Sequence, residues 1–593
     1  MNMFLLWMFA CMPKTPTTVE SGLTNTQQNV DSKALHSLLE DHWEATMKRW
    51  PIWATELGDR RYDDQLPETS PESWEKSRQG IQLWRDRIAK IDASQLTDSD
   101  RITLEFLDSV FADAQTQSVC LDEQWKLSPR SNAFGSLSRL AEIADLKTPE
   151  GGSNLLSRYG NIGTYIDGQI ANLRLGMQAG RTPNAESLRR TIEMLDTELA
   201  KPSQEWRFLK PIQATRTDWA PDEKERFEIA IRTVNQQIIR PAFVRYRSFL
   251  NDELLPVSRP TEKAGVLHLP NGKACYEAAI SHHTTMEKTA AELHQTGLDA
   301  LAGIHDEFRA LGESVWNESD LKQIFHRLRT DQDLFFSDSD AVVQKAESSL
   351  RRAESVVEKY FGILPKAACI VTPIPDFEAP YSTIAYYRPP RPDGSVPGQY
   401  FINKYKPETR PIHEAEVLAF HESVPGHHLQ LAIAQEQASL PEFRKHFRAT
   451  AYTEGWALYT ERLADEMGLY SSDIDRLGML SFDAWRAARL VVDTGLHAEG
   501  WSRAQAIDFM LENTPLAPNN IENEVDRYLS WPGQALAYKT GQIEVLRLRS
   551  KAQEELGSAF NIKDWHDAVL QVGAVPLPVL EGHLDRWIKQ RKQ

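Results

Sequence analysis

Apolar residues recur at helical spacing along most of this 593-residue chain. Between Pro221 and Pro241 they follow one another after four, three and four residues, which places them on one face of a helix: Phe227, Ile231, Val234 and Ile238. Because proline lacks the amide hydrogen that a helix needs, we expect Pro241 to kink or end this helix. The same spacing predicts helices within residues 277–311, 340–360, 414–437, 453–467 and 473–497. We therefore expect a mainly α fold.

One stretch, residues 381–405, departs from this pattern. It combines prolines and glycines with pairs of aromatic residues, Tyr386 with Tyr387 and Tyr400 with Phe401. Such a pattern is typical of a β-hairpin, here with its turn near Pro392 to Gly394. We therefore predict a small antiparallel hairpin or sheet ahead of the helical stretch that begins near residue 412.

Composition places the chain among folded globular proteins, with 41% hydrophobic and 25% charged residues. No Gly/Ser-rich linker follows residue 32 and no repeat of 20 to 50 residues is visible. We expect residues 33–593 to form one large helical body, in two lobes with a boundary near residue 260. The net charge of −17, with no basic run, argues against nucleic acid as a partner. After the N-terminus, no apolar stretch reaches the ~18 to 20 residues of a membrane span.

The N-terminus resembles a bacterial lipoprotein signal. The apolar run Met3 to Ala10 stops at Cys11, and a tract rich in Thr, Ser, Asn and Gln continues to Ser32. In this interpretation Cys11 carries the lipid and residues 1–32 comprise the signal and a flexible tether, which implies a location in the cell envelope, facing the periplasm or the outside. No basic residue precedes the apolar run, and the alternative is an unstructured N-terminus with a chance cysteine.

The remaining cysteines, Cys120, Cys275 and Cys369, are far apart and lack the spacing of a metal knuckle. We expect them to be buried thiols and predict no disulfide framework.

The segment Phe420–His428 reads Phe-His-Glu-Ser-Val-Pro-Gly-His-His and lies in a predicted helix. It is similar to the HExxH helix of zinc hydrolases, in which two histidines four residues apart bind one Zn²⁺. Here the residue four positions after His421 is Pro425, which cannot bind a metal.

The second histidine ligand must then come from His427 or His428, and neither faces His421 on an unbroken helix. Pro425 removes one helical amide, and Gly426 tolerates backbone angles closed to other residues. If these two residues bulge out, His427 takes the position that normally lies four residues along. His427 is therefore the predicted ligand, and His428 is the alternative.

Glu422 and Glu454 complete the predicted centre. Glu422 lies about 100° around the helix from His421, so it can act on a water beside the metal as general base without being a ligand. Glu454, 27 residues after His427 at the start of another predicted helix, is the predicted third ligand. The alternative is that Glu454 only complements the helix dipole. Gly455 is expected to let this helix pack against the first, and Glu461 is a substitute ligand or a partner of one.

Two further clusters contain polar groups suited to stabilise a transition state. Arg489, Asp493 and His497 are spaced by four residues and share a helix face, so Asp493 could orient a catalytic His497; a solvated ion-pairing face is the alternative. In residues 527–541 a tyrosine could donate to an oxyanion and Arg527 or Arg489 could hold a carboxylate, although either tyrosine could equally be a packing residue. From this segment we predict that Arg527, Tyr528 and Gln534 bind substrate, and either Tyr528 or Tyr538 is a candidate catalytic donor.

These motifs resemble the bacterial DUF885 family, a group of lipoproteins and predicted metallopeptidases. The similarity runs from the segment Pro51–Gly58 through His-Glu-x-x-Pro-Gly-His-His and Glu-Gly-Trp-Ala to Pro-Gly-Gln-Ala-x-x-Tyr near the end. The family looks like a distant relative of the helical gluzincin peptidases, which enclose a deep channel. The resemblance implies that His421, His427 and Glu454 bind zinc and that Glu422 is the general base.

The resemblance also implies a strand ahead of the metal helix that aligns the substrate backbone, a role expected of Tyr400 to Asn403, and a late tyrosine near the zinc, matched by Tyr538. The function expected first is a zinc peptidase that acts on short peptides, in the manner of a carboxypeptidase or dipeptidase. The alternatives are a zinc hydrolase of another amide or ester and a non-catalytic binding lipoprotein.

Overall fold

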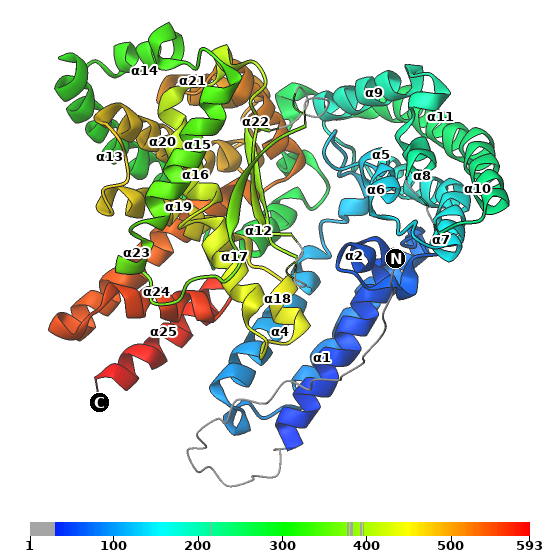
Figure 1. The fold of residues 1–593 in the computed structure, drawn as a ribbon, viewed down its shortest axis with the longest axis horizontal. Coiled ribbons are helices and arrows are strands. Elements are labelled where there is room, and N and C mark those ends of the chain that lie inside the picture. Colours follow the sequence, from blue (N-terminus) through cyan, green and yellow to red (C-terminus); the bar gives the residue numbers. More distant parts are fainter. Residues whose placement is uncertain are drawn as a thin grey trace, which may run out of the picture.

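A computed structural model describes residues 30–214, 216, 218–375, 379, 383–391, 394 and 396–592. Residues 1–29 of the predicted signal and tether, with Cys11, lie outside these residues, as do Pro392 and Asp393 of the predicted turn. The predicted end of the tether at Ser32 is wrong by three residues, because helix α1 (Val30–Arg49) begins at Val30. The mainly α fold is confirmed (Figure 1). No helix in the described ranges is both long enough and apolar enough to cross a membrane.

The largest hydrophobic cluster joins the first helices of the chain to elements that follow residue 260. Apart from Leu96, its N-terminal members lie on α1 (Val30–Arg49), α3 (Pro71–Ile88) and α4 (Asp98–Gln117). The short α2 (Pro51–Glu56) lies between α1 and α3 in the sequence. The later helices before the sheet are α12 (Gly272–Thr284), α13 (Ala290–Trp316), α14 (Leu321–Thr330) and α15 (Ser339–Glu354). The helix predicted within residues 277–311 is therefore divided, because Thr285 adopts a left-handed conformation that ends α12.

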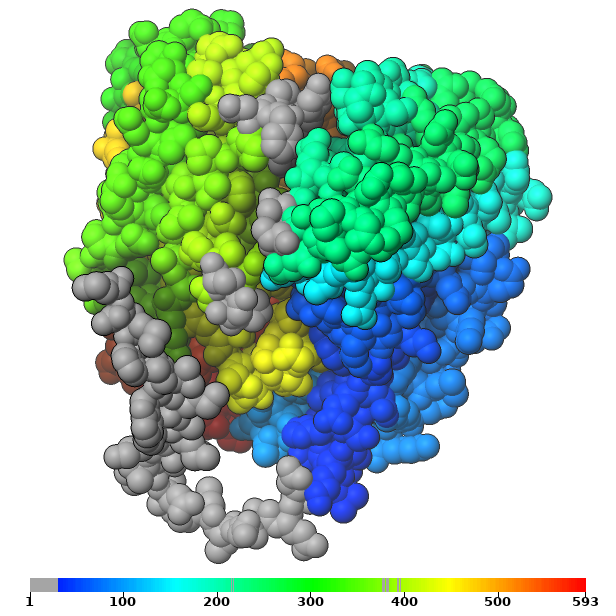
Figure 2. Space-filling model, turned by 45° about the vertical axis from the view of Figure 1, so that its right-hand side comes forward, coloured from blue at the N-terminus to red at the C-terminus, as the bar shows by residue number. Residues whose placement is uncertain are grey.

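A second hydrophobic cluster contains only residues from Leu127 to Leu254. Its helices are α5 (Ala133–Ser138), α6 (Leu140–Ile143), α7 (Pro149–Gly160), α8 (Ile162–Gln178), α9 (Ala185–Ala200), α10 (Pro221–Val234) and α11 (Arg240–Phe249). They form the cyan to blue-green part of the molecule, beside the larger body (Figures 1 and 2). The predicted boundary near residue 260 falls just after this cluster, whereas α1, α3 and α4 contribute to the larger core.

The helix predicted from Pro221 ends at Val234, and Phe227 and Ile231 are its buried residues. A π-helical turn, Asn235–Ile239, connects it to α11. Pro241 lies in the first turn of α11, directly after this π-helical turn. Because Val234, Ile239 and Arg240 all have right-handed helical backbone angles, Pro241 does not end the helical stretch.

The third group of helices carries the candidate site. It comprises α16 (Ala415–Glu422), α17 (His427–Glu436), α18 (Glu442–His446), α19 (Thr450–Glu466), α20 (Asp473–His497), α21 (Arg503–Asn513), α22 (Pro518–Ser530), α23 (Ala537–Leu556), α24 (Ile562–Gln571) and α25 (Leu577–Arg591). Helix α20 has the predicted bounds, and every residue from Leu477 to His497 is buried. It is therefore the central helix of the larger body.

The sheet has three strands, β1 (Cys369–Pro373), β2 (Ala385–Arg388) and β3 (Gly398–Ile402), in the order β1-β3-β2. The predicted hairpin is confirmed, because β2 and β3 are antiparallel, with Tyr387 opposite Tyr400. Strand β1, which pairs in parallel with β3, was not predicted. Its five residues are too few to separate a strand from a helix by periodicity.

The prediction of three free thiols is wrong for two of them. Cys120 and Cys275 form a disulfide, with their Cα atoms 4.7 Å apart, while Cys369 is free and buried, as predicted. Cys120 follows α4 and Cys275 lies on α12, and these two helices pack against each other. Residues 155 positions apart are thus brought together by helix packing, which no local spacing reveals.

Candidate metal centre

The predicted metal helix is broken into two: α16 ends at Glu422, and α17 begins at His427. The Val424–Pro425 peptide bond in this break is cis. A Cβ atom on Gly426 would lie 2.0 Å from the carbonyl oxygen of His421, so only glycine allows the chain to pass so close to the end of α16. The break at Pro425 and Gly426 is therefore real, although it separates two helices instead of forming a bulge in one.

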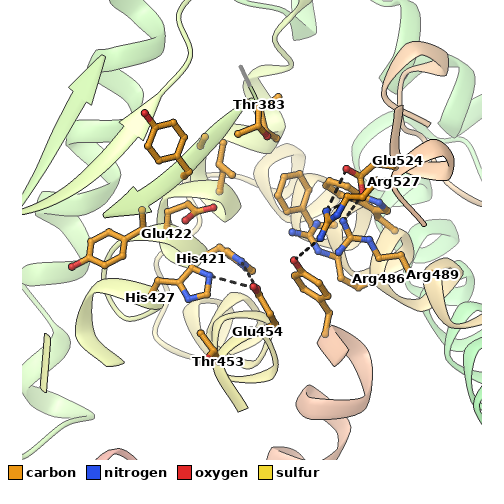
Figure 3. Close-up of a pocket in the computed structure, with 18 of the residues that line it drawn as sticks. Thr383, His421, Glu422, His427, Thr453, Glu454, Arg486, Arg489, Glu524 and Arg527 are labelled. Atoms are coloured by element: carbon orange, nitrogen blue, oxygen red, sulfur yellow. Dashed lines mark hydrogen bonds and ion pairs between the residues drawn. The ribbon is translucent and has the colours of Figure 1, made fainter. Parts of the chain in front are cut away.

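This break brings His427 beside His421 and Glu454. Their ligand atoms all lie within 4.8 Å of one another, close enough to hold one metal ion. The Oε2 atom of Glu454 is 3.8 Å from Nε2 of His421 and 3.5 Å from Nε2 of His427 (Figure 3).

His428, the alternative ligand, turns away from this group. Its Nδ1 lies 2.8 Å from the hydroxyl of Tyr387, and its Nε2 lies 3.1 Å from the carbonyl oxygen of Ala367. With both ring nitrogens committed to these partners, His428 takes no part in the cluster of His421 and His427.

Glu454 is positioned by contacts of helix α19. The indole Nε1 of Trp456 donates to the carbonyl oxygen of Pro425 at 3.1 Å, which ties the start of α19 to the break between α16 and α17. The expected role of Gly455 in packing α19 against the metal helix is wrong. A Cβ atom on Gly455 would lie 2.4 Å from the Cα of Gly541, so this glycine allows α19 to approach α23.

Glu461 is a partner of the triad and not a member of it. Its Oε1 lies 2.7 Å from Nδ1 of His421, and its side chain is almost fully buried. A carboxylate on Nδ1 fixes the ring so that Nε2 faces Glu454. Burial alone would lower the pKa of His421, but contacts with Glu454 and Glu461 raise it to about 10. Burial would likewise raise the pKa of Glu454, yet the two histidines hold it well below its usual range.

The triad faces a pocket of about 350 Å³. It is lined by His421, His427, Glu454 and Glu422, and on one side by residues 383–387, which include most of β2. Across the pocket stand Arg486, Arg489, Arg527 and Glu524, as Figure 3 shows. Glu422 is only partly buried, and its carboxylate lies on the strand side of the histidines.

The DUF885 family model, described as a bacterial protein of unknown function, matches residues 51–584. The chain belongs to this family. A candidate lipoprotein from Colwellia psychrerythraea, known from its crystal structure, is 25% identical and superposes with a TM-score of 0.89, covering 95% of this chain and 100% of that one. A candidate lipoprotein of unknown function from Shewanella oneidensis is 19% identical, with a TM-score of 0.74 and coverage of 93% and 99%, and shares the fold. Among curated proteins, none matches.

Tyr538 and Arg527, two of the residues singled out in this DUF885 chain, do line the pocket. Nη2 of Arg527 donates to the hydroxyl of Tyr538 at 3.3 Å. Tyr528 and Gln534 lie behind them: the Tyr528 hydroxyl accepts from Nε of Arg489 at 2.8 Å, and the side-chain oxygen of Gln534 accepts from Arg527. These two residues therefore hold the arginines and do not face the pocket.

The structure does not bring His497 to the site. Its Nδ1 accepts from the backbone amide of Val266 and its Nε2 donates to the carbonyl oxygen of Tyr528, both at 3.1 Å. Asp493 does not orient it, because this carboxylate accepts from the hydroxyl of Tyr276 at 2.6 Å and from the amide of Gly533. Burial lowers the pKa of His497 to about 3, so its ring is a neutral structural element.

The expectation that Tyr400 to Asn403 align the substrate backbone does not fit the structure. The Asn403 side chain donates to the carbonyl oxygens of Ala379 and Thr383 and accepts from the amide of Tyr405. Strand β3 is the central strand, paired on both sides, so its backbone has no free edge for a substrate. The strand beside the pocket is the edge strand β2.

Arg486 was missed by the sequence analysis. It lies three residues before Arg489 on α20, so helical spacing alone places both on one face. Arg130, which also lines the pocket, stands between α4 and α5, and no local pattern indicates its position.

Proposed function

We propose that this chain is a zinc-dependent hydrolase that cleaves peptide bonds of short peptides, in the manner of the helical gluzincin peptidases. The observation that carries the proposal is the cluster of His421, His427 and Glu454, with Glu422 beside it in the pocket. Two imidazoles and one carboxylate are the donor set of many catalytic zinc sites, which leave one position open.

The residues present fit a cation. Glu461 leaves only Nε2 of His421 available to a metal, and Nε2 of His427 faces the same oxygen atom of Glu454. Two carboxylates around the His421 ring favour positive charge at this place. When bound, Zn²⁺ would acidify a water and polarise the scissile carbonyl.

Glu422 is the proposed general base. It directly follows His421 on α16, so its side chain points about 100° around the helix and is free of the ligand positions. From the pocket wall its carboxylate can accept a proton from the attacking water and return it to the leaving amine.

Tyr538 is the proposed donor to the developing oxyanion. Its hydroxyl oxygen accepts a hydrogen bond from Arg527, which leaves the hydroxyl proton free for a substrate oxygen. The nearby guanidinium of Arg527 also favours the negative charge that develops on the substrate oxygen.

Strand β2 replaces β3 as the proposed aligning strand. Among the strands that the structure describes it is an edge strand, and residues 383–387 line the pocket, so an extended peptide can add to its outer edge. A pocket of about 350 Å³ admits a few residues and excludes a folded protein. Short peptides are therefore the proposed substrates. The same residues could also hydrolyse another amide or an ester, so these compounds belong in the assay.

For location we propose an extracytoplasmic lipoprotein anchored through Cys11. Two structural neighbours are candidate lipoproteins, and the Cys120–Cys275 disulfide suits an oxidising compartment.

The test is Glu422→Gln, which preserves shape and hydrogen-bonding reach but removes the basicity. This variant should keep the zinc content of the wild type and lose at least ~10²-fold in peptide hydrolysis. Glu442→Gln, a charge-matched change on α18 outside the pocket, should leave the rate unchanged. Equal rates for wild type and Glu422→Gln would refute the mechanism. If zinc-loaded wild type cleaves nothing in a panel of peptides, amides and esters, the non-catalytic binding lipoprotein is the better account.

A further inference from the structure

Two arginines of α20 line the pocket and carry donor groups without an acceptor in the described part of the chain. Arg486 and Arg489 are only 4% and 2% exposed. Nε and Nη1 of Arg486 and Nη1 of Arg489 form no hydrogen bond with any residue that the structure describes. A buried charged donor without an acceptor carries a large free-energy cost, so such groups in native proteins need an explanation. A ligand with anionic oxygens would supply the missing acceptors.

The charges on this wall are unbalanced. Glu524 lies 2.8 Å from Arg489 and 3.3 Å from Arg527, so one carboxylate serves two guanidinium groups. Nη2 of Arg486 is 3.8 Å from Glu461, and that carboxylate is already bonded to His421 at 2.7 Å. The wall therefore retains positive charge and favours an anion.

Aromatic rings fix the planes of both guanidinium groups. The Cζ atoms of Arg486 and Arg489 lie 4.2 and 4.4 Å from the ring centre of Trp485, and Arg489 lies 4.4 Å from that of Tyr538. Stacking of this kind orients the N–H groups before a ligand arrives. A planar, preoriented guanidinium matches the two oxygens of a carboxylate.

We propose that Arg486 and Arg489 bind the C-terminal carboxylate of the substrate, which makes the chain selective for short peptides with a free C-terminus and directs hydrolysis close to that end. This inference rests on the proposed function. Figure 3 places the arginines across the pocket from His421, His427 and Glu454, so a peptide can reach both walls at once.

Binding can be measured without turnover in zinc-loaded Glu422→Gln by titration calorimetry with three probes. They are N-acetyl-Ala-Ala, its C-terminal amide, and N-acetyl-Ala-Glu amide, which carries its carboxylate on a side chain. The free acid should bind about 10- to 100-fold more tightly than either amide, the range expected for hydrogen bonds to a charged group. Equal affinity for the free acid and its amide would overturn the inference. So would equal affinity for the side-chain acid, because the site would then recognise any carboxylate.

Variants then assign the preference to this wall. In the Glu422→Gln background, Arg489→Gln should bring the ratio of acid to amide affinity close to one. Arg489→Lys keeps the charge but loses the paired N–H groups of the guanidinium, so it should lower this ratio in part. It replaces the first variant in the test if Arg489→Gln does not fold. Arg547→Gln removes a charge from α23 outside the pocket and should keep the wild-type ratio. An unchanged ratio in folded Arg489→Gln or Arg489→Lys would contradict the proposal.

The outcomes separate this inference from the proposed function. Preference for the free acid together with no hydrolysis by the wild type would support the carboxylate site and refute the peptidase. If the wild type hydrolyses acids and amides at the same rate and binds both equally, the peptidase is supported and the carboxylate site is refuted.

Discussion

The Cys120–Cys275 disulfide closes a chain segment that contains the whole second hydrophobic cluster, Leu127 to Leu254. Replacing both cysteines by alanine removes the cross-link and releases that segment in the unfolded state. For a separation of 155 residues, loop-closure entropy gives about 5 kcal/mol of stabilisation, at the top of the range measured for disulfides. We therefore expect the double variant to lose about 2–5 kcal/mol in the free energy of unfolding.

Cys369→Ala is the matched control, because it removes one buried sulfur atom and no cross-link. The free energy of unfolding can be measured by guanidinium unfolding followed by tryptophan fluorescence. The decrease in the double variant should clearly exceed twice the decrease in Cys369→Ala. A reductant should destabilise the wild type and leave the double variant unchanged. Two results would show that the cross-link does not stabilise the fold: a loss of stability in the double variant no larger than twice that of Cys369→Ala, or no effect of the reductant on the wild type.

Three further predictions concern the metal centre and the anchor. Glu461→Gln should weaken zinc binding about 10- to 100-fold in a chelator competition by disturbing the ring of His421, whereas Glu466→Gln, an exposed change on the same helix, should not. Gly426→Ala should cost at least about 1–3 kcal/mol of stability in denaturant unfolding and weaken zinc binding, because the added methyl overlaps the end of α16; wild-type values would contradict the geometry. Cys11→Ser should shift the protein from the membrane fraction to the soluble one or leave it unprocessed, and a wild type found wholly soluble in its host would argue against the anchor.

Sequence reasoning succeeded where the determining signals are local. Apolar spacing alone predicted the bounds of α20, Asp473 to His497. In the structure the side chain of Ser472 caps this helix by accepting from the amide of Asp475. The position of His427 follows in the same way, because Pro425 and Gly426 interrupt the helix at a known place.

Features that depend on how distant segments pack were not predicted. The disulfide requires that α4 meet α12, and the close approach of α19 to α23 requires that Gly455 meet Gly541. The spacing of Arg489 and His497 correctly indicated a shared helix, but a helix buried on all sides points its residues toward different neighbours. Only the fold shows that Arg489 reaches the pocket while His497 bonds to backbone atoms.

The zinc content of the folded wild type and of three single alanine variants can be measured by plasma mass spectrometry. If His421, His427 and Glu454 bind the metal, the wild type and His428→Ala should each contain about one zinc per chain, and His421→Ala and His427→Ala should lose it. His428 is the matched control, since it is the adjacent histidine and differs in facing Tyr387 and Ala367. A full complement of zinc in His427→Ala, or no zinc in a wild type supplied with it, would contradict the assignment of this metal centre.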